Sequence, residues 1–300
     1  FYKKFNFWII CTLFILIIID GKQIAEELRH KLKKEIDQLP KNLIKPGLTV
    51  ILIGDHPASQ IYVRNKEKFA KEVGINSKLL KFDDTITEKD LIQKIHKLND
   101  DSAVHGILVQ LPLPSHIDSG KIISEISPTK DVDGFHPNNV GNLSSGNDAL
   151  VPCTPYGCYL LLKKVIPNLS GLHAVIIGRS NINGKPMAQL LLKENCTVTI
   201  THSKTKNLKD LCLTADILVA SVGSPQMVKA DWVKKDCVII DVGINRLEDN
   251  GTKRIVGDVD FENVKDLVKA ITPVPGGVGP MTISCLLNNT VKAYKKINSI

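Results

Sequence analysis

The sequence lacks the usual signatures of a metal centre and of a disulfide framework. Its seven cysteines are scattered and odd in number, with no Cys-x-x-Cys pair, and its eight histidines show no metal-ligand spacing. Such cysteine usage is typical of reduced thiols, so we expect a cytoplasmic protein without a metal. A hydrophobic core can replace such crosslinks, because 43% of the 300 residues are apolar.

The sequence also lacks basic blocks interleaved with aromatic residues, internal repeats and low-complexity tracts. The formal net charge is nevertheless +8, which favours anionic partners. Because the lysines are spread along the chain, we expect an anionic small molecule and no nucleic acid.

An apolar leader opens the chain and has no clear role. Lys3-Lys4 precede an apolar run over 5–19, which is short of the roughly 20 residues of a membrane span. The run resembles a signal peptide, but no small-residue cleavage site follows it. A mis-set start or fragment and a genuine N-terminal anchor both stay open. We place residues 1–17 outside the fold and expect membrane contact only if the leader is genuine.

Apolar runs alternate with amphipathic stretches along the rest of the chain. This alternation predicts an α/β fold with parallel sheets and right-handed crossovers. The expected strands are 48–53, 78–82, 104–110, 173–177, 197–201, 217–220 and 238–242. A polar, glycine-containing segment over 138–148 suggests a domain boundary near Leu150.

A predicted helix after the first of these strands carries an unusual lysine. Tyr62, Lys66, Phe69 and Val73 fall on one face of it, so Lys66 lies in line with an apolar stripe. A partly desolvated amine has a lowered pKa and can act as a base or proton donor. The alternative is a lysine that extends from the edge of the stripe into solvent.

Two polar residues follow expected strands or turns, and each has two interpretations. Gln110 either only ends a strand or hydrogen-bonds the Lys66 amine. Asp133 either stabilises a turn before Gly134 or accepts hydrogen bonds from a planar, amidine-like edge such as that of a pterin. Spacing does not decide between these alternatives.

The second half of the chain contains a weak dinucleotide-binding pattern. Gly178, Ser180 and Asn183 stand where a G-x-G-x-x-G motif has glycines, and a plain strand–helix turn remains an alternative. The next strand ends in the segment 201–206, which has no acidic residue. With Arg179 it forms a cationic, hydroxyl-bearing set suited to a 2′-phosphate. We therefore expect NADP rather than NAD, with a solvated basic loop as the alternative.

Five motifs occur in order: Tyr-x-x-x-Lys at 62–66, GILVQLPLP at 106–114, KDVDG at 130–134, GRS at 178–180 and PGGVGPMT at 275–282. Together they resemble the bifunctional methylenetetrahydrofolate dehydrogenase/methenyltetrahydrofolate cyclohydrolase family, over about residues 18 to 297. The resemblance implies NADP-dependent oxidation of 5,10-methylenetetrahydrofolate, followed by hydrolysis to 10-formyltetrahydrofolate. Alternatives are a relative with dehydrogenase activity only and a catalytically silent folate- or nucleotide-binding module.

The resemblance also implies an architecture. Two domains flank a cleft: a folate-binding catalytic domain (18–150 plus 281–300) and a Rossmann-type NADP-binding domain (151–280). The last helix returns to the first domain, and the enzyme is a homodimer. The basic excess suits a polyglutamylated tetrahydrofolate.

The resemblance assigns residue roles as well. The implied catalytic residues are Lys66, Tyr62, Gln110 and Asp133. Residues implied to bind substrate are Tyr62, Gln110, Leu111, Asp133, Pro275 and Gly276. Residues implied to bind the cofactor are Thr154, Gly178, Arg179, Ser180, Ile182, Ser203, Ile244, Gly279 and Thr282. One departure is Asn183, where the family commonly has an apolar residue, so cofactor affinity is in question at this position.

Overall fold

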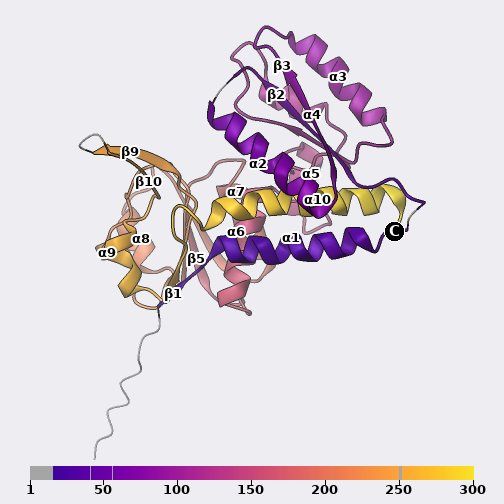
Figure 1. Ribbon diagram of the computed structural model, residues 1–300. Helices are drawn as coiled ribbons and strands as arrows, with labels where there is room; N and C mark the ends of the chain where they lie inside the picture. Colours follow the sequence, from indigo (N-terminus) through magenta and orange to yellow (C-terminus); the bar gives the residue numbers. More distant parts are fainter. Residues whose placement is uncertain (1–15, 41, 56, 250–251) are drawn as a thin grey trace, which may run out of the picture.

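A computed structural model of the chain describes residues 16–40, 42–55, 57–249 and 252–300 (Figure 1). The expectations for the apolar leader fall mostly on residues 1–15, which lie outside the described residues. Within the described part of the chain, no helix is long and apolar enough to cross a membrane.

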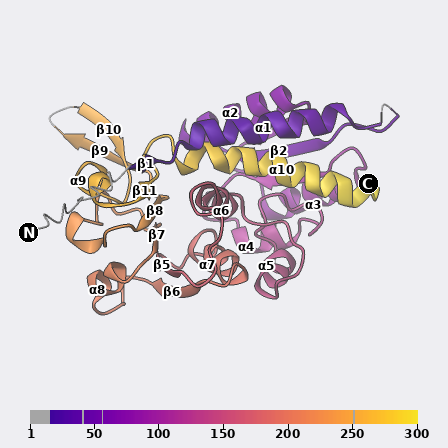
Figure 2. The ribbon, with the colours of Figure 1, turned by 90° about the horizontal axis from the view of Figure 1, so that it is seen from below.

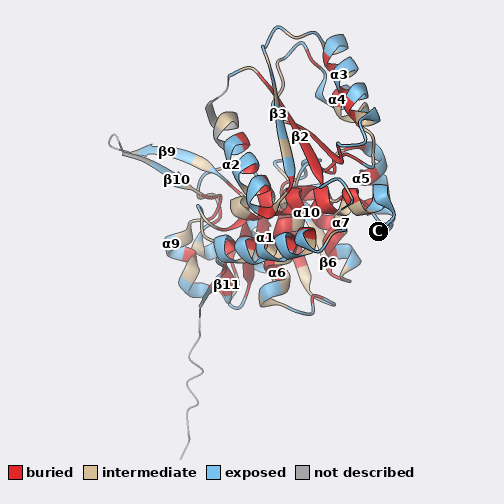
Figure 3. Ribbon diagram, turned by 45° about the vertical axis from the view of Figure 1, so that its right-hand side comes forward, coloured by how far each residue is buried: buried red, intermediate tan, exposed pale blue. Residues whose placement is uncertain are grey.

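The first sheet has three parallel strands in the order β3-β2-β4: β3 (Asn76–Phe82), β2 (Gly47–Ile53) and β4 (Gly106–Val109). Figure 3 shows that β2 is buried along its length, whereas the edge strand β3 is largely exposed. The helices of this half are α1 (Gly21–Asp37), α2 (Pro57–Val73), α3 (Glu88–Asp100), α4 (Ser119–Ser124) and α5 (Pro137–Ser144). Composition did not predict α5, because its sequence is polar and contains glycine.

The second sheet has six parallel strands in the order β1-β11-β8-β7-β5-β6. They are β1 (Ile17–Ile18), β5 (His173–Ile177), β6 (Thr197–Thr201), β7 (Ile217–Ala220), β8 (Val238–Asp241) and β11 (Ala270–Ile271). The helices of this half are α6 (Cys153–Val165), α7 (Gly184–Lys193), α8 (Leu208–Leu213) and α9 (Phe261–Val264), with 3-10 turns at Ala230–Trp232 and Lys265–Leu267. An antiparallel hairpin, β9 (Asn245–Asp249) and β10 (Thr252–Val256), projects from this half (Figure 1).

The chain enters the second sheet before it enters the first. Ile17 pairs with Ala270 and Ile18 with Ile271. Ile17, expected to lie in the leader outside the fold, is therefore part of a strand of the second sheet. Two residues are too few to leave a periodic pattern, so neither β1 nor β11 was predicted.

The last helix, α10 (Val278–Asn298), joins the two halves. It lies alongside α1 in both ribbon views and also packs on α6 (Figure 2). Its buried residues Met281, Leu286 and Leu287 belong to a core cluster that includes residues of both sheets. The predicted α/β fold with two units and a returning last helix is therefore confirmed.

Candidate active site

Lys66 lies on the buried face of α2 and is 8% exposed. Its Nζ donates a hydrogen bond to Gln110 Oε1 at 2.9 Å. Gln110 follows β4, and its Nε2 donates to the Leu111 carbonyl at 2.8 Å, which turns Oε1 toward the amine. Burial lowers the pKa of Lys66, and nearby Asp133 and Cys153 partly oppose this shift. The site thus holds an amine of reduced proton affinity in a fixed orientation.

Asp133 lies close enough to Lys66 for their charges to interact. Burial raises the pKa of Asp133, and Lys66 acts in the opposite direction. Its segment is fixed by the buried Asp131, whose carboxylate accepts from the Gly134 N–H at 3.2 Å and the His136 N–H at 2.8 Å. Gly134 has φ +75° and no room for a Cβ, which would lie 2.6 Å from Pro152 N. The backbone that carries this carboxylate is therefore tightly constrained.

A pocket of ≈ 630 Å³ lies between the two halves of the molecule. This volume suits a small-molecule ligand. It is formed by α1, α2, the end of β8, the hairpin, the 273–277 turn and the start of α10. It brings together five predicted site residues: Tyr62, Pro275, Gly276, Ile244 and Gly279. Substrate-side and cofactor-side candidates thus share one pocket.

Other predicted residues stand near this pocket. Lys66, Gln110 and Asp133 are not among the described residues that line this pocket. Tyr62, which does line it, lies one turn before Lys66 on α2. The hydroxyl oxygens of Thr154 and Thr282 lie 3.0 Å apart. Thr154 is in the first turn of α6, and Thr282 is near the start of α10. This contact holds the starts of the two helices together.

The remaining cofactor candidates lie at the carboxyl end of the second sheet, where such sheets bind ligands. Gly178 has φ +123°, and a Cβ there would lie 2.3 Å from the Ser221 carbonyl oxygen. Its N–H donates to the Thr201 carbonyl at 2.9 Å, which holds the turn after β5 beside the end of β6. Four predicted cofactor residues on these two turns are exposed: Arg179, Ser180, Ile182 and Ser203.

Asn183 is the N-cap residue of α7 and makes no side-chain cap hydrogen bond. Its backbone N–H donates to Ser180 Oγ at 3.1 Å, and its side chain is partly buried. A Cβ at the next residue, Gly184, would lie 2.1 Å from the Gly178 carbonyl oxygen. The absence of a Cβ at Gly184 therefore allows the start of α7 to approach the turn at Gly178 closely.

Several residues that line the pocket were not predicted from the sequence. Lys22 and Arg29 come from α1, Asn65 from α2 and Arg246 from the hairpin. Arg29 is buried, lies 4.2 Å over the Phe69 ring and donates to Ser284 Oγ at 3.1 Å. An arginine in an amphipathic helix gives no sign of such burial, because its partners are distant in sequence.

Asp241 was also missed, although it ends β8 and that position could have indicated a site. Its buried carboxylate lines the pocket and accepts from the N–H groups of Gly243, Asp258 and Val259 at 3.0, 2.9 and 2.9 Å. Burial raises its pKa to about 7, against the effect of these hydrogen bonds. Asp241 therefore shapes the pocket wall through backbone contacts.

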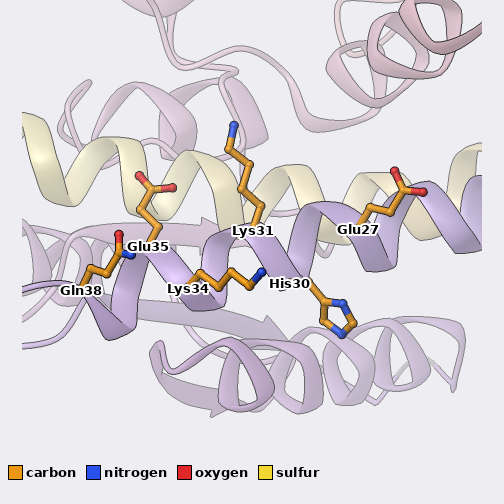
Figure 4. Close-up of a pocket in the computed structure, with 6 residues that line it drawn as sticks. All are labelled: Glu27, His30, Lys31, Lys34, Glu35 and Gln38. Atoms are coloured by element: carbon orange, nitrogen blue, oxygen red, sulfur yellow. The ribbon is translucent and has the colours of Figure 1, made fainter.

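A second hollow runs along α1 (Figure 4). It is lined by Glu27, His30, Lys31, Lys34 and Glu35 of this helix and by its C-cap residue, Gln38. Glu27 pairs with Lys164 at 2.6 Å, and Glu35 pairs with Lys295. None of the predicted site residues lines it, so it is a charged helix surface. In the described parts of the chain, His, Cys, Asp and Glu side chains form no group of three or more that could hold a metal ion.

Two models of one protein family match this chain over most of its length. Residues 19–133 match the family model "Tetrahydrofolate dehydrogenase/cyclohydrolase, catalytic domain". Residues 152–298 match "Tetrahydrofolate dehydrogenase/cyclohydrolase, NAD(P)-binding domain". The chain belongs to the tetrahydrofolate dehydrogenase/cyclohydrolase family. The second match extends to the last residue of α10, the helix that packs on both halves.

Individual relatives agree with this assignment over nearly their whole length. "Bifunctional protein FolD" of Pelagibacter ubique is 64% identical over 282 residues, which are 94% of this chain and 99% of the relative. The protein of the same description from Bacillus cytotoxicus is 54% identical over 286 residues, 95% of this chain and 99% of the relative.

Solved structures give the same result. The bifunctional enzyme FolD of Campylobacter jejuni has a TM-score of 0.91 and 48% identity, covering 94% of this chain and 99% of that one. The Trypanosoma brucei enzyme, complexed with NADP cofactor and inhibitor, has a TM-score of 0.89 and 37% identity, covering 94% and 98%. The predictions of the family, of an enzyme with both activities and of an NADP-type cofactor are therefore confirmed.

Proposed function

We propose that Lys66 performs the proton transfer of the cyclohydrolase step. Support comes from its burial and from the 2.9 Å hydrogen bond to Gln110, the observation that carries the proposal. A neutral amine can take a proton from the water that attacks the one-carbon bridge of methenyltetrahydrofolate. A substrate cation beside the amine lowers its pKa further, in the same direction as burial.

The neighbouring residues hold the folate and the amine in place. Gln110 orients the Lys66 amine through its side-chain carbonyl. The Asp133 carboxylate accepts hydrogen bonds from the 2-amino group and ring N–H of the pterin. Tyr62 flanks the folate ring from the wall of the pocket, which the turn containing Pro275 and Gly276 also lines. Leu111 also belongs to the residues that bind the substrate.

We assign the cofactor side to NADP, which accepts the hydride from methylenetetrahydrofolate when bound. Arg179 and Ser203 are exposed on adjacent turns and suit a 2′-phosphate, because a guanidinium and a hydroxyl both donate to phosphate oxygens. The turn containing Gly178, Ser180 and Ile182 faces the pyrophosphate. Thr154, Ile244, Gly279 and Thr282 complete the cofactor contacts.

Three finer points belong to the same proposal. The enzyme acts as a homodimer in the cytoplasm, where the six described cysteines stay free thiols. Its substrate is polyglutamylated, in keeping with the net charge of +8. Salt should then raise KM more for polyglutamylated than for monoglutamylated substrate, because it screens the additional carboxylates. Equal salt sensitivity of the two KM values would contradict this.

A spectrophotometric assay tests the two activities and the choice of cofactor. Methylenetetrahydrofolate is supplied with NADP or with NAD in parallel, and 10-formyltetrahydrofolate is measured as the final product. We expect reduction of NADP well above that of NAD, together with formation of the 10-formyl product. If the cofactor is reduced but the product remains methenyltetrahydrofolate, the enzyme has dehydrogenase activity only. A preference for NAD would refute the cofactor assignment.

A further inference from the structure

Asn289 on α10 is a buried amide whose two donors contact backbone far away in sequence. It is 2% exposed. Its Nδ2 donates to the Val132 carbonyl at 2.9 Å and to the Val151 carbonyl at 2.8 Å. A side-chain amide nitrogen has two N–H groups, so this pair of contacts uses both. The last helix is thereby attached to the segment before Asp133 and to the segment before α6.

The Val132 carbonyl receives a second donor. Cys153 Sγ lies 3.3 Å from it and 3.8 Å from Asn289 Nδ2. Burial raises the pKa of the Cys153 thiol well above its usual range, so the thiol keeps its proton and can donate. Val132 itself is fully buried. The backbone immediately before Asp133 is therefore fixed by two side chains from helices α10 and α6.

We propose that Asn289 is a positioning residue for the folate substrate, acting through the Val132 carbonyl to fix the direction of the Asp133 carboxylate. Asp133 follows Val132 directly, so a rotation of the Val132 peptide group displaces the carboxylate. The residues after Asp133 are fixed by the Asp131 carboxylate, which accepts hydrogen bonds from the N–H groups of Gly134 and His136. The inference rests on the proposed role of Asp133 in holding the pterin.

Two substitutions in the full-length enzyme test this. Asn289→Ala removes both donors, and Asn289→Asp replaces them with a carboxylate that faces two carbonyl oxygens. We expect the KM for methylenetetrahydrofolate to rise about tenfold or more, as for the loss of a buried hydrogen bond of about 1.4 kcal/mol. The KM for NADP should stay within about twofold, because the proposed role of Asp133 is to hold the folate.

Thr290→Val is the matched control on the same helix. The Thr290 hydroxyl is fully buried and donates to the Leu286 carbonyl at 2.9 Å, inside α10. This variant should lower Tm and leave the folate KM within about twofold. A lowered Tm with an unchanged folate KM in both Asn289 variants would give Asn289 a structural role only and overturn the inference. An equal rise of KM in Thr290→Val would overturn it too.

Two further variants keep the test decisive. If neither Asn289 variant folds, Cys153→Ala removes the second donor to the Val132 carbonyl together with the contact of the thiol to the Asp133 side chain. We expect the folate KM of this variant to rise about threefold, and an unchanged value overturns the inference. Asp133→Asn separates the two proposals. A normal folate KM in Asp133→Asn refutes the role of Asp133, whereas a raised KM there with normal Asn289 variants refutes only the role of Asn289.

Discussion

The folate side and the cofactor side of this molecule are built differently. Lys66, Gln110 and Asp133 lie at least partly buried, and the first two are hydrogen-bonded to each other. Arg179 and Ser203 are exposed on turns at the carboxyl end of the second sheet. The folate side is therefore largely preorganised by the protein, as expected where a reacting amine must be desolvated and oriented. The cofactor side presents donors that a phosphate can contact from solvent.

This difference leads to different expectations for mutants. Changes on the preorganised side should affect the chemical step or the folate KM. Changes on the exposed side should affect the KM for the cofactor and leave the hydrolysis intact.

Lys66→Met should have the largest effect. We expect the cyclohydrolase kcat to fall by about 10² or more, the usual contribution of a positioned base. Folate binding should be largely retained, because methionine keeps the apolar stem. Lys71→Met, exposed on the same helix, serves as the control. An unchanged rate of methenyltetrahydrofolate hydrolysis in Lys66→Met would refute the assignment.

Asp133→Ala should impair both activities, because both use the same bound pterin. We expect the folate KM to rise about tenfold or more in the dehydrogenase and the cyclohydrolase assay alike. Asp83→Ala, at an exposed residue, is the control and should leave both KM values unchanged. A loss confined to one activity would contradict a role in holding the pterin.

Arg179→Ala should weaken NADP selectively. Loss of a charge-assisted hydrogen bond of about 1.5–3 kcal/mol raises the KM for NADP by about ten- to a hundredfold. The KM for NAD, which has no 2′-phosphate, is the internal control and should hardly change. Equal effects on the two cofactors would show that Arg179 does not contact the 2′-phosphate.

Gln110→Met should shift the pH dependence of hydrolysis. The active amine is neutral, so kcat falls as the pH drops through the pKa of Lys66, which burial places below its usual value. The Gln110 carbonyl stabilises the ammonium, and its removal should move this acid limb to lower pH by about one unit. An acid limb that stays in place, or moves to higher pH, would contradict this role of Gln110.

Asn183→Val should have the smallest effect. The Asn183 side chain makes no cap hydrogen bond, and the close contact of turn and helix involves Gly178 and Gly184 instead. We expect the KM for NADP to stay within about threefold of the starting value. A larger change would mean that this side chain contacts the bound cofactor.

Local patterns predicted much of the fold and part of the site. The alternation of apolar runs indicated both parallel sheets, and helical spacing placed Lys66 in line with Phe69 and Val73 on α2. The hydrogen bond between Lys66 and Gln110 was one of two alternatives for Gln110, and the structure contains it. The hairpin and the short strands β1 and β11 were missed, since such elements lack a distinct period.

Periodicity and ordered motifs are local properties of the chain, so they were enough to establish the alternating α/β architecture and the family. The pairing of groups distant in sequence depends instead on how the folded elements pack. Arg29 contacts Ser284, and Asn289 contacts Val132, across 255 and 157 positions of sequence. Such contacts depend on how α10 packs between the two halves, and packing of buried polar groups leaves no periodic trace along the chain.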